Sequence, residues 1–295
     1  GAGYVGVEMA EAFAAWDLDV HLFQRSGRPV PGFGDAVGDA VTEHLRESAV
    51  TLHFGEEVRR LDGAGGHVDR VVCDDGTELS VDAALVGIGI RPNTGLLEET
   101  PVELGESGAV ATDEYGRTSL ENVYAAGDVA EMPHTVTDEP TWNPLGLPAN
   151  RAGRAIGSTV GGDPEPVGRV SGTAMVKAFD LECGRTGLLD HDQAREAGFD
   201  PVSETITAGS RSGYYPGAAE TTVTLTADRD TGRLLGGSIV GTDRAAVRID
   251  TIATALGGGM TVAELERQDL GYAPPFSPVW DPVLVAAKVL NGSLE

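Results

Sequence analysis

The chain opens on a glycine-rich turn, which limits the possible folds more than any other feature of the sequence. It begins GAGYVGVEMAEAF, so that Gly1, Gly3 and Gly6 form a G-x-G-x-x-G pattern that runs into an amphipathic stretch. A short apolar segment, DVHLF, follows. In a βαβ unit such a turn lets backbone N–H groups and a helix N-terminus meet a pyrophosphate. The sequence therefore predicts an α/β, Rossmann-like nucleotide-binding unit.

A strand normally leads into this kind of turn, whereas here nothing precedes Gly1. A parallel sheet that lacks an inner strand leaves the two neighbouring strands without a partner. We therefore expect the sequence to start inside a longer protein.

Hydrophobic periodicity and the positions of Gly and Pro divide the chain into three parts. Residues 1–95 are expected to form the nucleotide-binding domain, with a helix from residue 35 to residue 45 and strands within AVTLHFG, GHVDRVVC, TELS and ALVGIGI. Hairpin turns are predicted at Gly65-Gly66 and Asp75-Gly76. Residues 96–165 contain the apolar segment NVYAAGD, read as a strand, and a helix opened by Pro148. This part is too small for an independent domain, so we interpret it as the end of a domain that begins upstream.

Residues 166–295 are predicted to form an α+β domain. Strands fit TAMVKAF, VSETITA, TTVTLTA and RLLGGSIV, and helices fit RAAVRIDTIATAL and the final DPVLVAAKVLNG. In the last helix Asp281 can cap the free N–H groups and Pro282 suits the first turn.

The charge balance is strongly acidic, with 46 Asp and Glu against 21 Lys and Arg and a net charge of -25. This excludes nucleic acid as an expected partner. Self-repulsion of this size opposes folding unless salt screens it, so we interpret the composition as an adaptation to a salt-rich cytoplasm. An ordinary acidic protein is the alternative. The sequence shows neither a transmembrane span nor a secretory signal, and a cytoplasmic location is expected.

The two cysteines, Cys73 and Cys183, are too few and too far apart for a disulfide framework or a metal cluster. Each is expected to be a small buried side chain, and no metal site is predicted.

In such a unit the residue that reads the ribose lies at the end of the strand that follows the glycine helix. Here that strand is DVHLF, and the residue is Gln24. An Asp or Glu would bind the 2′-hydroxyl of NAD. Gln24 is instead followed by Arg25 and Arg28, which favours a 2′-phosphate and hence NADPH over NADH. Alternatively, these arginines only cover an acidic surface.

Five ordered motifs, GAGYVGVEMAEAF, IGIRPNT, NVYAAGDVAE, GYYPGA and YAPPFSPVWDPV, together resemble the pyridine nucleotide-disulfide oxidoreductases. The chain is most similar to the branch of coenzyme A-disulfide reductases, NADH oxidases and NADH peroxidases, with a haloarchaeal-like composition. The resemblance implies FAD and NAD(P)H as cofactors. It implies that hydride passes from NAD(P)H to FAD, and that electrons then reach a small disulfide such as coenzyme A disulfide.

The resemblance also assigns roles to residues. Tyr4 and Glu8 would face the nicotinamide, although Tyr4 can instead be a packing residue. Asp128 would bind the ribityl chain of FAD unless it belongs to a plain turn. The remaining cofactor-binding candidates are Gly89 in IGIRPNT, Gly127 in AAGD, and Leu145, Gly146 and Leu147 before the helix, whose N-terminus would face the flavin pyrimidine.

The same resemblance implies a homodimer formed through the C-terminal domain. Tyr214, Tyr215 and Tyr272 would then reach the partner's active site, where a phenol can hydrogen-bond a thiol, a thiolate or the flavin; core packing is their alternative. The redox cysteine and the first FAD motif of the family lie upstream, so this chain alone is expected to be inactive. Two other functions remain open: an NADH oxidase or peroxidase that reduces oxygen or peroxide, and a non-catalytic nucleotide-binding or dimerisation module.

The net charge of -25 predicts a salt-dependent fold. In about 1 M salt the Debye length falls to roughly 3 Å, so repulsion among the acidic groups is screened. We expect the protein to unfold as potassium chloride is diluted, which circular dichroism and thermal unfolding at a series of salt concentrations will measure. Full stability in dilute buffer would contradict the salt-adaptation interpretation.

Overall fold

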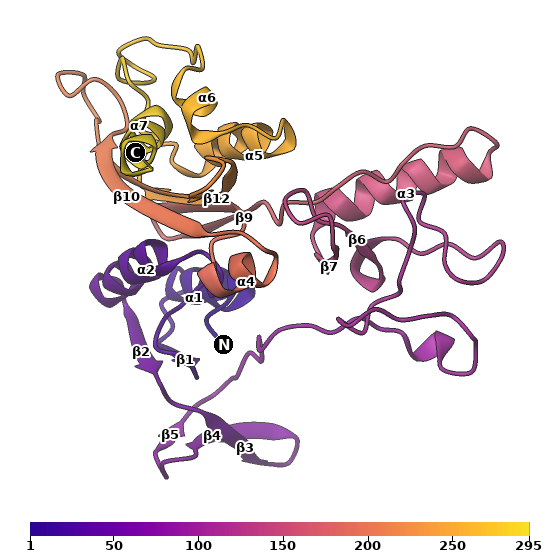
Figure 1. The fold of residues 1–295 in the computed structure, drawn as a ribbon. Coiled ribbons are helices and arrows are strands. Elements are labelled where there is room, and N and C mark those ends of the chain that lie inside the picture. Colours follow the sequence, from indigo (N-terminus) through magenta and orange to yellow (C-terminus); the bar gives the residue numbers. More distant parts are fainter. Residues whose placement is uncertain (295) are drawn as a thin grey trace.

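The computed structural model describes residues 1–294 and is of mixed α/β class, as predicted (Figure 1). The N-terminal unit contains helix α1 (Tyr4–Ala14), strand β1 (Val20–Gln24), helix α2 (Asp35–Glu47) and strand β2 (Val50–Phe54). Strands β1 and β2 pair in parallel. Helix α2 has an acidic residue in its first turn and basic residues in its last, an arrangement that complements the helix dipole.

A three-stranded antiparallel meander follows, made of β3 (Val58–Ala64), β4 (His67–Cys73) and β5 (Glu78–Ser80). The turn between β3 and β4 has positive φ angles at Gly65 and Gly66, of 64° and 84°. Gly76, at 91°, has the same role between β4 and β5. These backbone conformations are strained for residues with a Cβ, so the predicted hairpins form where the glycines occur.

The strand expected at ALVGIGI is wrong for this structure. Residues 84–90 carry no strand assignment, and their apolar side chains are exposed, Ile88 by 82%. A strand needs a neighbour to complete its hydrogen-bond ladder, and no strand among residues 1–294 pairs with this segment. The segment instead runs past the glycine turn, where Gly87 contacts Gly1 and Gly6.

The middle part contains the short 3-10 helices η1 (Gly95–Leu97) and η2 (Gly127–Val129), a small hairpin of β6 (Glu131–Pro133) and β7 (Pro140–Trp142), and helix α3 (Gly146–Val160). The strand expected at NVYAAGD is also wrong. Within that segment Tyr124 forms an isolated bridge with Arg117, and Gly127 and Asp128 already belong to η2. Helix α3 begins two residues before Pro148, which places the proline in the first turn, where a missing N–H costs nothing.

The C-terminal part is built on a five-stranded antiparallel sheet in the order β10-β11-β12-β9-β8. Its strands are β8 (Ala174–Ala178), β9 (Leu181–Gly187), β10 (Pro201–Gly209), β11 (Glu220–Asp228) and β12 (Leu234–Gly241). Its helices are α4 (His191–Glu196), η3 (Ala246–Arg248), α5 (Ile249–Gly257), α6 (Val262–Glu266) and α7 (Pro282–Ser293). The start of α7 is as predicted, because the Asp281 side chain accepts a hydrogen bond from the Val283 N–H at 3.0 Å.

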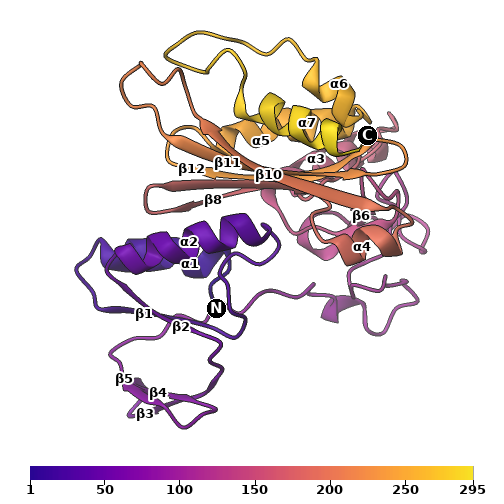
Figure 2. The same ribbon diagram turned by 60° about the vertical axis from the view of Figure 1, so that its left-hand side comes forward.

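This sheet is covered on both faces, as Figure 2 shows. Helices α5, α6 and α7 cover one face and enclose one buried core. Helices α1 and α2 of the N-terminal unit cover the other face, where Val41 and Leu45 share a second core with Val176 and Cys183. Because burial of one such apolar side chain contributes about 1.5–3 kcal/mol, this shared core fixes the N-terminal unit on the C-terminal sheet.

A polar contact at the edge of the shared core strengthens this docking. The Glu11 side chain on α1 accepts a hydrogen bond from the Phe179 N–H at 2.9 Å and forms an ion pair with Lys177. Among residues 1–294, no helix has the length and apolar character that a membrane crossing requires.

Candidate functional site

The glycine turn forms a tight bend with one open position. A Cβ on Gly6 would collide with the Gly1 carbonyl, and a Cβ on Gly1 would collide with Gly87, so the turn packs closely on itself. A Cβ on Gly3 would have no protein atom within 4 Å. Gly3 is the N-cap of α1 and provides no side-chain cap for the first N–H groups. The turn therefore offers free donors and space to an anionic group such as a pyrophosphate.

Gln24, at the end of β1, supports this turn directly. Its Oε1 atom accepts a hydrogen bond from the Ala2 N–H at 2.8 Å, and its Nε2 donates to Ser26 Oγ at 2.7 Å. The side chain that was expected to read the ribose thus ties the glycine turn to the loop after β1.

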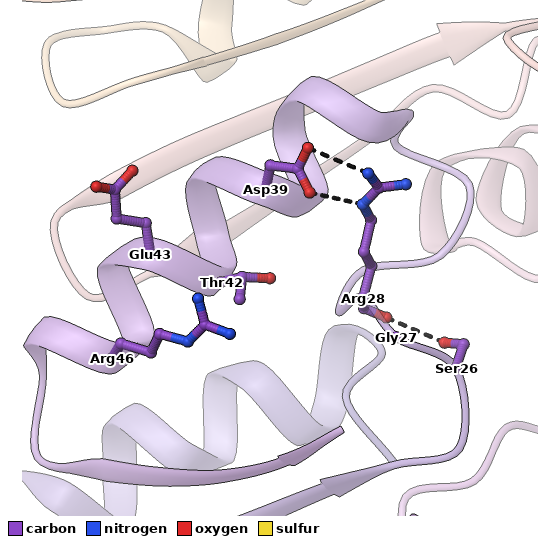
Figure 3. A pocket seen from close by; sticks show the side chains of 7 residues that line it. All are labelled: Ser26, Gly27, Arg28, Asp39, Thr42, Glu43 and Arg46. Carbon is purple, nitrogen blue, oxygen red and sulfur yellow. Dashed lines mark hydrogen bonds and ion pairs between the residues drawn. The ribbon is translucent and has the colours of Figure 1, made fainter. Parts of the chain in front are cut away.

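A cavity of about 760 Å³ lies between that loop and one face of α2 (Figure 3). Its lining residues are Ser26, Gly27, Arg28, Asp39, Thr42, Glu43 and Arg46. Arg28 pairs with Asp39 at 2.6 Å and with Asp35 at 2.8 Å, and these carboxylates raise its pKa. Arg25 is exposed and forms no ion pair within residues 1–294. Arg25 is therefore the freer of the two predicted arginines.

Sequence reasoning missed the contribution of α2 to this cavity. The lining residues of α2 begin with Asp39. Thr42, Glu43 and Arg46 follow it by three, four and seven residues, which is the spacing of one helix face. That periodic polar face was the signal that could have identified them.

Tyr4 is half-buried in the first turn of α1, and its ring packs edge-on against Phe33 with centroids 5.4 Å apart. Burial raises the pKa of Tyr4, and the nearby Arg185 partly opposes this shift. Glu8 lies one turn further along α1 and is exposed. Gly89 has a φ of 102° in the segment that passes the glycine turn.

The predicted flavin-binding residues meet around the start of α3. A Cβ on Gly127, which has a φ of 75°, would touch Ala149 of α3 at 3.4 Å. Asp128 is exposed, and its backbone carbonyl accepts a hydrogen bond from Trp142 Nε1 at 2.9 Å. A Cβ on Gly146 would have no protein atom within 4 Å, and the first turn of α3 has no side-chain cap.

Leu145 joins these residues to the glycine helix. It precedes the first turn of α3 and packs against the shared core of α1, α2 and the C-terminal sheet, which Tyr4 also contacts. Leu147, by contrast, is 75% exposed. The fold therefore brings the open end of α3 to the same side of the molecule as the glycine turn.

The three predicted tyrosines lie elsewhere. Tyr214 and Tyr215 belong to the loop between β10 and β11, and Tyr272 to the loop before α7. They are 79%, 37% and 49% exposed, so none is a core residue. In Figure 1 both loops lie on the opposite side of the C-terminal sheet from the glycine turn. Within one chain, the tyrosines and the nucleotide site do not meet.

The comparisons with known proteins agree with this geometry. The profile of the pyridine nucleotide-disulphide oxidoreductase family matches residues 1–141. The profile of the dimerisation domain of that family matches residues 173–282. A solved FAD-dependent pyridine nucleotide-disulphide oxidoreductase from Desulfovibrio vulgaris is 30% identical, with a TM-score of 0.84, over all of this chain and 70% of its own. The chain belongs to the pyridine nucleotide-disulphide oxidoreductase family.

Relatives with assigned activities are similar over nearly the whole of this chain. The NAD(P)H coenzyme A polysulfide/persulfide reductase of Pyrococcus horikoshii is 41% identical over 99% of this chain and 64% of its own length. An NADH oxidase of Methanocaldococcus jannaschii is 31% identical over 98% and 63%. The coenzyme A disulfide reductase of Staphylococcus aureus is 26% identical over 94% and 62%. The chain thus spans a little under two thirds of these relatives.

Two further solved structures resemble this chain. An NAD-dependent persulfide reductase from A. fulgidus has a TM-score of 0.94 and 36% identity, over 99% of this chain and 54% of its own. An engineered water-forming NADPH oxidase, derived from the Lactobacillus brevis NADH oxidase and bound to NADPH, has a TM-score of 0.90 and 26% identity, over 100% and 65%.

Both cysteines of the chain are buried, as expected, Cys73 at 3% and Cys183 at 0% exposure. Burial raises the pKa of Cys183 to about 12, and burial together with the charge of Glu56 raises the pKa of Cys73. Both groups therefore remain protonated thiols, which are poor nucleophiles. Among residues 1–294, no group of three His, Cys, Asp or Glu side chains is placed to hold a metal ion.

His134 provides a test of the packing beside the hairpin of β6 and β7. It lines a second cavity of about 460 Å³ that Trp142 and Arg185 also line. Its Nδ1 atom accepts hydrogen bonds from the Val136 and Thr137 N–H groups, which requires an unprotonated nitrogen. Burial, reinforced by Arg185, lowers the pKa of His134 from 6.5 to about 4.

We expect His134 to make the fold acid-sensitive. Between pH 6.5 and about 4 the unfolded chain binds a proton that the folded chain rejects, so stability is lost as the pH falls through this window. In His134→Asn the amide oxygen can accept the same turn hydrogen bonds without titrating. Between pH 6.5 and about 4, the unfolding free energy of the wild-type protein, measured in high salt, should fall more than that of His134→Asn. Parallel curves for the two proteins would contradict the lowered pKa of His134.

Proposed function

We propose that this chain provides the nicotinamide site, part of the flavin site and the dimer-forming domain of a flavoprotein. The full-length protein would pass electrons from NAD(P)H through FAD to a small disulfide such as coenzyme A disulfide. We assign residues 1–95 to NAD(P) binding, 96–165 to the end of the FAD-binding domain and 166–295 to dimerisation. The packing of Leu145 against the core that Tyr4 also contacts carries this proposal, because it brings the two cofactor-binding segments together.

The residues present fit both cofactors. The open position at Gly3 and the uncapped N–H groups of α1 suit the pyrophosphate of NAD(P)H. The exposed carboxylate of Asp128 can accept a hydrogen bond from a ribityl hydroxyl. The uncapped start of α3, beside Gly146, suits the electron-rich edge of the flavin pyrimidine.

When bound, FAD would supply the hydride- and electron-transfer chemistry between the nicotinamide and a sulfur. The positive end of α3 stabilises negative charge on the flavin pyrimidine. The ring of Tyr4 shields the site from water until the nicotinamide arrives, and Glu8 orients the carboxamide. Because Cys73 and Cys183 are buried thiols, we assign the redox-active sulfur to a part of the protein outside this sequence.

The exposed tyrosines support a homodimer. Since the loops that carry Tyr214, Tyr215 and Tyr272 lie on the opposite side of the C-terminal sheet from the glycine turn of their own chain, each tyrosine would act in the partner's active site, where a phenol O–H can donate to a thiolate or the flavin. We place this dimer in a salt-rich cytoplasm, on the basis of the net charge of -25.

Assay of the full-length protein under anaerobic conditions tests the reaction. We expect NADPH oxidation to depend on added coenzyme A disulfide and to release free thiol. Consumption of NADPH only with oxygen or peroxide would instead favour an NADH oxidase or peroxidase, the activity named for the relative from M. jannaschii. A folded dimer that binds NADPH without flavin would favour a non-catalytic module.

NADPH is favoured over NADH by a second observation. In the engineered NADPH oxidase an Asp, an Ala and a Met at consecutive positions were replaced by Ala, Arg and Ser, a fixed distance after a replaced Gly. At the same distance after Gly6 this chain has Gln24, Arg25 and Ser26. It therefore carries the Arg and Ser that were introduced there, whereas Gly6 and Pro31 keep the Gly and Pro that were replaced in that enzyme.

We expect Arg25→Ala to lower kcat/KM for NADPH roughly 10- to 100-fold and to leave NADH almost unchanged, because only the 2′-phosphate loses a charge-assisted hydrogen bond. Steady-state kinetics with both nucleotides will measure this ratio. Arg195→Ala, at an exposed arginine of α4, is the matched control. An equal loss with both nucleotides would contradict the role of Arg25.

A further inference from the structure

The two tyrosine loops are exposed, yet they share one buried cation. Arg248, at the end of η3, is only 10% exposed and forms an ion pair with Asp281 at 2.9 Å. Arginine has five N–H donors in a rigid planar fork. All five are used here, with Asp281 Oδ2 and the backbone carbonyls of Ser210, Asp243, Arg244 and Phe276 as acceptors.

Two of these acceptors lie in different tyrosine loops. Nη2 of Arg248 donates to the Ser210 carbonyl at 2.6 Å, at the base of the loop that carries Tyr214 and Tyr215. The same nitrogen donates to the Phe276 carbonyl at 3.2 Å, in the loop that carries Tyr272. One guanidinium group thus connects both loops directly.

Neighbouring arginines hold each loop separately. Arg211 pairs with Asp243, its Nε at 2.7 Å, and donates to the Pro216 carbonyl beside Tyr215. The hydrogen bond from Arg211 to Asp243 holds the pKa of the Asp243 carboxyl below its usual value. Arg244 donates to the Phe276 carbonyl at 2.7 Å. Among residues 1–294, only Arg248 forms hydrogen bonds with both loops.

The loops depend on these cations because they bury little apolar surface. Tyr272 and Phe276 are 49% and 61% exposed, and Tyr214 is 79% exposed. Each loop has a few backbone hydrogen bonds of its own, such as Tyr215 N–H to the Ser212 carbonyl and Phe276 N–H to the Ala273 carbonyl, but none of these joins one loop to the other. A lysine ammonium offers three donors from a single point, so it cannot replace a fork that reaches five acceptors.

We propose that Arg248 is a positioning residue that couples the two tyrosine loops, so that Tyr272 and the Tyr214–Tyr215 pair enter the partner's active site as one unit. This inference rests on the proposed function, because it assumes that the phenols act on a substrate there. Arg248 itself touches no substrate; it sets the distance between phenols that lie far apart in the sequence.

The test compares Arg248→Lys with the wild-type full-length protein. Reduction of the flavin by NADPH, followed by stopped-flow absorbance, should keep its wild-type rate, because Arg248 is remote from the glycine turn. Turnover with coenzyme A disulfide should fall roughly 10- to 100-fold, since small errors in catalytic geometry cost this much. In a Tyr272→Phe background the same substitution should have a clearly smaller effect. Wild-type turnover in Arg248→Lys, or an undiminished effect beside Tyr272→Phe, overturns the proposal.

Hydrogen exchange gives a readout that does not depend on the acceptor or on catalysis. Arg248→Lys should increase exchange in residues 210–219 and 270–278 together, whereas Arg211→Lys should affect mainly the first loop. Arg195→Lys on exposed α4 is the control that should change neither. If Arg248→Lys increases hydrogen exchange in only one of the two loops, the proposed coupling is overturned. This outcome holds even if the wild-type protein fails to reduce the disulfide. If Arg248→Lys does not fold, Arg211→Lys must still slow disulfide turnover without slowing flavin reduction, or the proposal falls.

Discussion

The packing of α1 and α2 against the C-terminal sheet is the interaction on which the rest of the structure depends. These helices lie between two sheets, and their buried faces meet Val176 and Cys183 in one continuous core. The Rossmann-like unit and the dimerisation domain are therefore not joined by a linker alone. Since every apolar contact across this interface adds to the stability of both parts, their relative position is fixed by burial rather than by chain connectivity.

This docking also creates the candidate site. The middle part of the chain has few strands of its own, yet Leu145 fixes the start of α3 beside the shared core. The open end of α3, which lies beside Gly127, then packs through Leu145 against the same core that Tyr4 of α1 contacts. Cys183, which lies in the same core, is a packing residue, and the high pKa that follows from its burial explains why it does not resemble a redox centre.

Much of the fold could be predicted from sequence because local signals were strong. Gly65, Gly66 and Gly76 determined the hairpin turns where expected. Asp281 likewise determined the start of α7. The segment from residue 84 to residue 90 and NVYAAGD were wrongly predicted as strands, although both are apolar. A strand is defined by its neighbour, and apolar composition does not reveal whether a neighbour is present. The short helices α4 and α6 and strand β9 had no periodic signal long enough to identify them.

By itself, the sequence determined the chemistry that the chain can offer: a glycine turn without a side chain at Gly3, a carboxylate after AAGD, and three tyrosines near the C-terminus. It did so because these features are local and depend on residue type. Only the tertiary structure decided which groups are free to act. It commits Arg28 to two aspartates and Gln24 to the turn, leaves Arg25 exposed, and joins two distant tyrosine loops through Arg248. Such pairings depend on distances between residues far apart in the chain, which burial and hydrogen bonding set only when the whole chain has folded.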